Sequence, residues 1–116
     1  MDLTITNLRR QYRDGTLTPA AVVEEILRRT ADDPNRVWIH RLPAAQLRAR
    51  AAALAERDPA TLPLYGVPFA IKDNIDLAGV PTTAACPAFA FTPERSAAVV
   101  QRLIDAGAIA VGKTNL

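Results

Sequence analysis

The sequence predicts an α/β fold, with a helical first half over residues 1–58 and a strand–helix–strand unit in residues 59–116. Two observations carry this prediction. Apolar residues recur at helical spacing through the first half, whereas two short apolar runs, 67–71 and 108–111, flank a single helical pattern in the second. Strands joined through a helix should be parallel, with a right-handed crossover. The 116 residues, 49% of them hydrophobic and 22% charged, are within the range of one globular domain.

The first half should contain three helices and one short strand. Gly15 is typical of a helix C-terminus, and Thr18-Pro19 matches an N-cap followed by the first helical residue. A third helix should begin at Pro43 and end at Asp58-Pro59, because proline disfavours helical geometry in the residue before it. The predicted helices cover about residues 4–14, 19–30 and 43–58, and the predicted strand is Val37–Ile39.

The second half contains two predicted buried strands, Val67–Ile71 and Ala108–Val111. The proline inside the first strand is unusual, because it removes a donor from the ladder. Thr92-Pro93 should start the connecting helix, with Ser96 capping its first turn. Residues 72–92 fit no regular element, and a loop of that length in a compact domain is usually functional. Four aromatic side chains allow two interpretations, the lining of a substrate funnel or, as we expect, the packing of this loop onto the sheet: Tyr65, Phe69, Phe89 and Phe91.

The composition argues against several classes of function. The net charge is +2 and the 14 basic residues are spread along the chain, whereas a nucleic-acid-binding protein concentrates them in a stripe. The single Cys86 allows no intrachain disulfide and should be a small packed side chain. The lone His40 should be part of the surface or of a hinge rather than a metal ligand. We find no apolar stretch long enough to span a membrane and no signal peptide. We therefore expect a cytoplasmic protein with no metal, nucleic-acid or membrane partner.

The two lysines of the chain follow the two predicted strands of the second half. Lys72 comes after Val67–Ile71, and Lys113 comes after Ala108–Val111. Ligands of open α/β sheets bind beyond the carboxyl ends of the strands, so both lysines should lie at the functional edge. In one interpretation they are ordinary solvated residues. In the other, Lys72 is half buried beside Asp73, where burial lowers a lysine's pKa and lets it act as a general base.

Two sequence blocks resemble the amidase signature family. The first is Gly66–Asn74 (GVPFAIKDN) followed by Gly79–Thr83 (GVPTT), and the second is Val111–Asn115 (VGKTN). The resemblance covers residues 60–116 well and the helical first half weakly. The run Thr82–Phe89 (TTAACPAF) is similar to that of allophanate hydrolases, which act in urea breakdown.

The resemblance implies both a fold and a chemistry. The family fold is α/β/α with a mixed central sheet, of which residues 1–116 would be the N-terminal portion. The implied catalytic group is a Ser–cis-Ser–Lys triad, in which one serine attacks an amide carbonyl and a second serine relays its proton to a lysine. Lys72 matches that lysine. Lys113 matches a motif lysine for which we expect a structural role. The resemblance implies no metal and no organic cofactor.

Both triad serines of the family should lie downstream of Asn115, and Ser96, the single serine here, cannot fill two positions. We therefore expect these residues alone to be inactive. The complete enzyme is expected to be a homodimer that hydrolyses a small amide, allophanate, to ammonia and carbon dioxide. The alternatives are another amidase, the amidase subunit of a tRNA-dependent amidotransferase, or a non-catalytic remnant.

Overall fold

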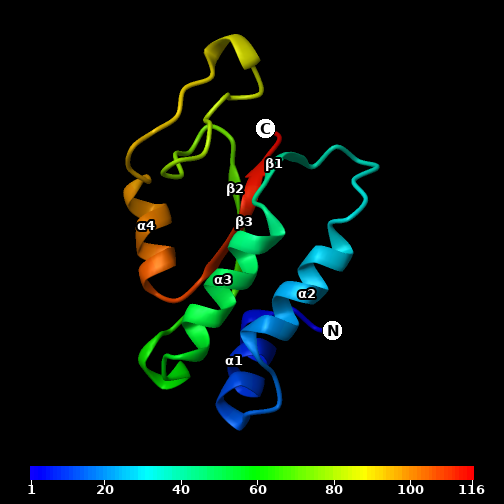
Figure 1. Cartoon of the computed structure of the whole chain (residues 1–116), viewed down its shortest axis with the longest axis vertical. Coiled ribbons are helices and arrows are strands. Elements are labelled where there is room, and N and C mark those ends of the chain that lie inside the picture. Colours follow the sequence, from blue (N-terminus) through cyan, green and yellow to red (C-terminus); the bar gives the residue numbers. More distant parts are fainter.

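The computed structural model describes all 116 residues and places four α-helices around a three-stranded sheet (Figure 1). Two short 3-10 helices lie in the connecting segments. None of the helices has the length and apolar character that a membrane span requires. In chain order the elements are α1 (Ile5–Asp14), α2 (Pro19–Arg29), β1 (Trp38–Arg41), α3 (Ala44–Ala55), η1 (Pro59–Thr61), β2 (Pro68–Lys72), η2 (Pro87–Phe89), α4 (Ala98–Asp105) and β3 (Ile109–Thr114).

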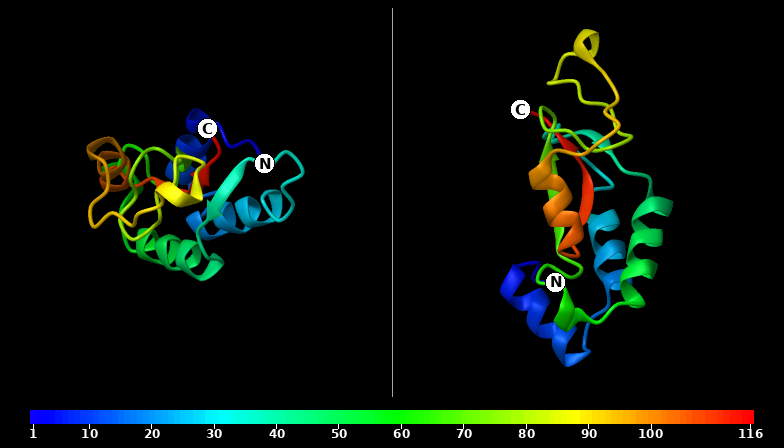
Figure 2. Two further views of the ribbon diagram at one scale, coloured as in Figure 1. Left: turned by 90° about the horizontal axis from the view of Figure 1, so that it is seen from above. Right: turned by 90° about the vertical axis from the view of Figure 1, so that its left-hand side faces the viewer.

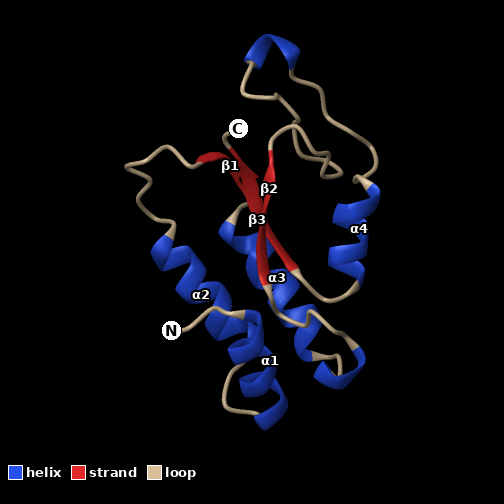
Figure 3. Ribbon diagram, turned by 180° about the vertical axis from the view of Figure 1, so that it is seen from behind, coloured by secondary structure: helices blue, strands red, loops and turns tan.

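The sheet is mixed, as predicted. Its order is β1-β3-β2, with β3 antiparallel to β1 and parallel to β2, so the expected parallel pair is confirmed. Pro68 is tolerated because it is the first residue of β2, and β2 lies at the edge of the sheet. Just before it, the Val67 carbonyl accepts a hydrogen bond of 2.8 Å from the Ile109 N–H. In the view of Figure 3 the strands lie nearer the viewer than α3, and no helix crosses the upper part of this face of the sheet.

The first two helices form where their end signals predict them, whereas α3 ends at Ala55, before the predicted stop at Asp58-Pro59. Thr4 caps α1, which ends at Gly15 with a left-handed φ of 73°. The Thr18 side chain accepts a hydrogen bond from the Ala21 N–H at the start of α2. The buried face of α3 carries Leu47, Ala51 and Leu54, at the predicted helical spacing. The helices therefore follow from local sequence signals together with one apolar face each.

A tyrosine joins α1 to the chain segment that leads into β2. The Tyr12 hydroxyl donates a hydrogen bond of 2.8 Å to the Gly66 carbonyl, and its ring meets Tyr65 edge-on at 5.1 Å between centroids. Gly66 has a φ of 66°, and a Cβ there would lie 2.4 Å from the Tyr12 hydroxyl. Only glycine fits this position, since both the backbone conformation and the space exclude a side chain. The core around these residues includes buried side chains from α1, α2, α3, β2, α4 and β3.

The predicted start of α4 is wrong. The helix begins at Ala98 rather than at Thr92-Pro93, because the preceding segment bonds to the turn after β2 instead. The Ala97 N–H donates to the Asp76 carbonyl at 3.0 Å, and the Ser96 hydroxyl accepts from the Ala78 N–H at 2.9 Å. Ser96 therefore anchors a loop and does not cap the helix.

The loop between β2 and α4 extends beyond the carboxyl ends of the strands (Figure 1; Figure 2, right). Its tip is less well packed than the sequence predicts. Cys86 is exposed, so the expectation of a packed cysteine is wrong. Phe89 and Phe91 remain 58% and 46% exposed and meet each other edge-on, whereas Tyr65 and Phe69 do contact the core. The aromatic prediction is therefore confirmed for two residues and wrong for the two at the tip.

Candidate active site

The two lysines reach the same end of the sheet but opposite faces. In the parallel β2–β3 pair, Ile71 is the partner of Lys113 and Lys72 is the partner of Thr114. Because side chains alternate along a strand, Lys72 projects from the face opposite to Ile71 and Lys113. Exposure agrees, since Lys72 is exposed whereas the Lys113 side chain has no accessible surface.

Lys72 lies on the open side of the sheet. It ends β2, and Ala70, which precedes it on the same face, is also exposed. The prediction of a half-buried Lys72 is wrong for these 116 residues, because no element of the chain covers this face. An amine at the carboxyl end of a parallel strand, on an open face, is placed where ligands of α/β sheets bind.

Lys113 contradicts the interpretation of a solvated lysine and agrees with the expected structural role. Its Nζ lies 3.1 Å from the Asp73 Oδ1, and both side chains are completely buried. The same Nζ donates to the Thr82 hydroxyl at 3.3 Å and to the Pro81 carbonyl at 3.4 Å. On the partner strand β1, the half-buried His40 lies opposite Lys113 in register.

Asp73 is a fully buried carboxylate whose pairing with Lys113 the sequence did not predict. Burial by itself raises the pKa of its carboxyl, but the hydrogen bonds from Thr83 and the positive charge of the Lys113 ammonium outweigh this effect and hold the pKa below its usual range. Its Oδ2 accepts from both the backbone N–H and the hydroxyl of Thr83. Its Oδ1 faces Lys113 but receives no well-aligned hydrogen bond. The available signal was a carboxylate directly after one strand and a lysine within the next.

A strained turn follows Thr83. Ala84 and Ala85 both have left-handed backbones, with φ of 50° and 60°. This conformation costs about 1–2 kcal/mol for each residue that has a side chain. The Ala84 N–H donates to the Asp73 carbonyl at 3.0 Å, and the Cys86 N–H closes the turn on the Thr83 carbonyl at 2.8 Å. Contacts with Asp73 therefore maintain a turn that its own residues disfavour.

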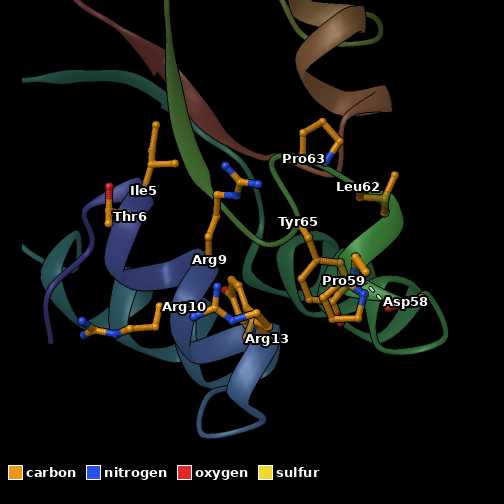
Figure 4. A pocket seen from close by; sticks show the side chains of 12 residues that line it. Ile5, Thr6, Arg9, Arg10, Arg13, Asp58, Pro59, Leu62, Pro63 and Tyr65 are labelled. Carbon is orange, nitrogen blue, oxygen red and sulfur yellow. Dashed lines mark hydrogen bonds between the residues drawn. The ribbon is translucent and has the colours of Figure 1, made fainter.

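A sizeable cavity of the chain lies elsewhere. It measures about 620 Å³ and lies between α1 and residues 58–65, with arginines of α1 and the ring of Tyr65 along its wall (Figure 4). Lys72 does not line it. No group of three or more His, Cys, Asp or Glu side chains is placed to hold a metal ion. The chemistry available at the sheet edge is therefore that of a lysine amine supported by a buried ion pair.

Comparison with known proteins decides the family. The model of the family described as Amidase matches residues 21–116. This chain belongs to the amidase family. It is 52% identical over 83 residues to the urea amidolyase of Saccharomyces cerevisiae, and 41% identical over 118 residues to a glutamyl-tRNA(Gln) amidotransferase subunit of Chloroflexus aurantiacus. These alignments cover 71% and 97% of this chain.

Solved structures agree with the sequence comparison. The allophanate hydrolase of Kluyveromyces lactis superposes with a TM-score of 0.75 at 41% identity, over 89% of this amidase chain. The chain covers 18% of that structure, 4% of the yeast urea amidolyase and 24% of the amidotransferase subunit. It corresponds to an N-terminal part of the amidase fold. The predicted family and fold are thereby confirmed, whereas the assignment of Lys72 as the base stays a prediction.

Proposed function

We propose that these residues form the N-terminal part of a Ser–cis-Ser–Lys amidohydrolase that acts on allophanate, with Lys72 as the base. The observation that carries this proposal is the position of Lys72, at the carboxyl end of β2 on the uncovered face of the sheet. Identity of 52% with a urea amidolyase and 41% with an allophanate hydrolase structure supports the choice of substrate. The complete enzyme would be a cytoplasmic homodimer without a metal or organic cofactor.

The proposed reaction uses Lys72 only for proton transfer. A serine oxygen attacks the amide carbon while its proton passes to the second serine, whose own proton passes to the neutral Lys72 amine. Lys72 then returns a proton along the same path, so that ammonia leaves and an acyl-enzyme remains for water to hydrolyse. Removing water from a lysine favours the neutral amine that this step needs. The proposed mechanism therefore requires the rest of the enzyme to cover the open face of the sheet on which Lys72 lies.

We further propose that the 116 residues alone do not catalyse this reaction. The triad needs two serines, and the single serine, Ser96, bonds to the Ala78 N–H in the loop before α4. Measurable ammonia release from allophanate by the purified 116-residue chain would overturn the triad assignment.

A second candidate is the amidase subunit of a tRNA-dependent amidotransferase. It is favoured by the breadth of that alignment, which covers 97% of the chain at 41% identity. Against it stand the higher identity with urea amidolyase and the run Thr82–Phe89. Both candidates share the lysine chemistry and differ in substrate.

The test is a chimera in which residues 1–116 replace the matching N-terminal residues of the Kluyveromyces lactis allophanate hydrolase. Ammonia release is measured with allophanate, glutamine and a simple aliphatic amide at equal concentrations, and the unaltered Kluyveromyces enzyme is the control. The proposal predicts turnover with allophanate well above the other two. A chimera that folds but hydrolyses none of them contradicts the proposal, and preference for glutamine favours the amidotransferase alternative.

A further inference from the structure

The buried pair of Lys113 and Asp73 has no task in the reaction proposed above. Neither side chain has accessible surface, and the two charged atoms lie 3.1 Å apart. Removing two charges from water is costly, and apolar side chains of similar volume are often as stable in such places. Stability alone is therefore a poor explanation for this pair. The contacts of the two side chains indicate a different role.

Asp73 connects three segments at the end of the sheet. Its N–H donates to the Thr114 carbonyl of β3 at 3.0 Å, and its carbonyl accepts from Ala84 at 3.0 Å. Its carboxylate accepts two hydrogen bonds from Thr83. Because Asp73 directly follows Lys72, these contacts fix the backbone from which the Lys72 side chain projects.

Lys113 holds the other side of the same loop. Its ammonium donates to the Pro81 carbonyl and to the Thr82 hydroxyl, which itself donates to the Asp76 carboxylate at 2.8 Å. One cation in the central strand thus contacts Asp73 and both residues that precede Thr83. This network therefore holds the strained turn after Thr83 through contacts of both Asp73 and Lys113.

We propose that Lys113 and Asp73 are positioning residues for Lys72. Their buried ion pair fixes the end of β2 and the turn beside it, and so sets the direction from which Lys72 reaches the reacting hydroxyl. Neither residue touches substrate, because both lie on the opposite face of the sheet, sealed from solvent. The inference rests on the proposed function, since it assigns Lys72 a proton-transfer role.

The test uses the chimera and three variants: Lys113→Met, Asp73→Asn, and the two together. Each single variant should lower kcat about 100-fold with little change in KM, because misplacing a reacting group by about 1 Å has an effect of that order. The double variant leaves no unpaired buried charge, so its melting temperature should recover. Its kcat should stay low, because the network that aims Lys72 is still absent.

Leu54→Ala is the matched control. Leu54 is buried in α3 and is not part of the network, so its loss destabilises the fold while kcat should hold. A double variant that regains kcat together with its melting temperature overturns the inference, as does an equal loss of kcat in Leu54→Ala. If the unsubstituted chimera folds and releases no ammonia, the proposed function fails and the inference fails with it. Failure of the proposed function is therefore distinguished from failure of this inference, because it is seen in the unsubstituted chimera before any variant is made.

Discussion

Lys113→Met keeps a long unbranched side chain but removes the cation that faces the buried Asp73 carboxylate. The carboxylate can escape burial as an unpaired charge by binding a proton. At pH 7 this costs about 1.4 kcal/mol for each pH unit above its ordinary pKa of about 3.9, or about 4 kcal/mol in all. The figure agrees with the loss of about 3–5 kcal/mol observed when one partner of a buried pair is removed.

The sign of the pH dependence follows from the same reasoning. In Lys113→Met the folded-state pKa of Asp73 is raised above its unfolded value, so the destabilisation grows with pH above about 4. At pH 5 the loss should fall to about 1.5 kcal/mol. The original chain behaves oppositely, because there the folded-state pKa of Asp73 is lowered.

The assay is urea unfolding of the 116-residue chain at pH 7 and at pH 5. Unfolding is followed by the fluorescence of its single tryptophan, Trp38, in β1. The double variant Asp73→Asn/Lys113→Met is the control, and it should be less destabilised at pH 7 than Lys113→Met. A loss below about 1 kcal/mol at pH 7, or an equal loss at both pH values, would refute the reasoning, since a buried unpaired carboxylate predicts neither.

Three further predictions concern stability. Gly112→Ala should cost about 1–3 kcal/mol in urea unfolding, because a Cβ would lie 2.4 Å from the His40 carbonyl, and a cost near zero would contradict this packing. Burial raises the pKa of Tyr12, so stability should be lost as pH rises above about 10, and Tyr12→Phe should weaken that dependence in alkaline unfolding curves. The lowered pKa of Asp73 contributes stability that is present above about pH 4 and lost below it; an acid transition unchanged in Asp73→Asn would count against this.

The fold was predictable wherever local signals decide it. Caps, helix stops and apolar spacing located the helices of the first half, and two apolar runs located the parallel strands. The start of α4 was not predictable in this way. Thr92-Pro93 is a good helix start, but the loop after β2 binds the Pro93 carbonyl and the Ala97 N–H instead. A tertiary contact overrode a local preference there.

The candidate site was half predictable. The rule that ligands bind at the carboxyl ends of strands located Lys72, and the resemblance gave it a role. The alternation that places Lys72 and Lys113 on opposite faces depends on the exact bounds of β2 and β3 and on the irregularity in their pairing after Phe69. The partnership of Lys113 with Asp73, far apart in the sequence, depends on that register. Sequence patterns carry no information on such a pairing until the register is known.

The most direct test of the central claim is the kcat of the chimera with Lys72→Met. Methionine keeps the unbranched shape of the lysine side chain and removes only its amine, so circular dichroism should show that the fold of the chimera is unchanged. If Lys72 is the base, kcat for ammonia release from allophanate should fall between about 10²-fold and 10⁴-fold. Near-normal kcat in a chimera with the original melting temperature would contradict the assignment of Lys72 as the base.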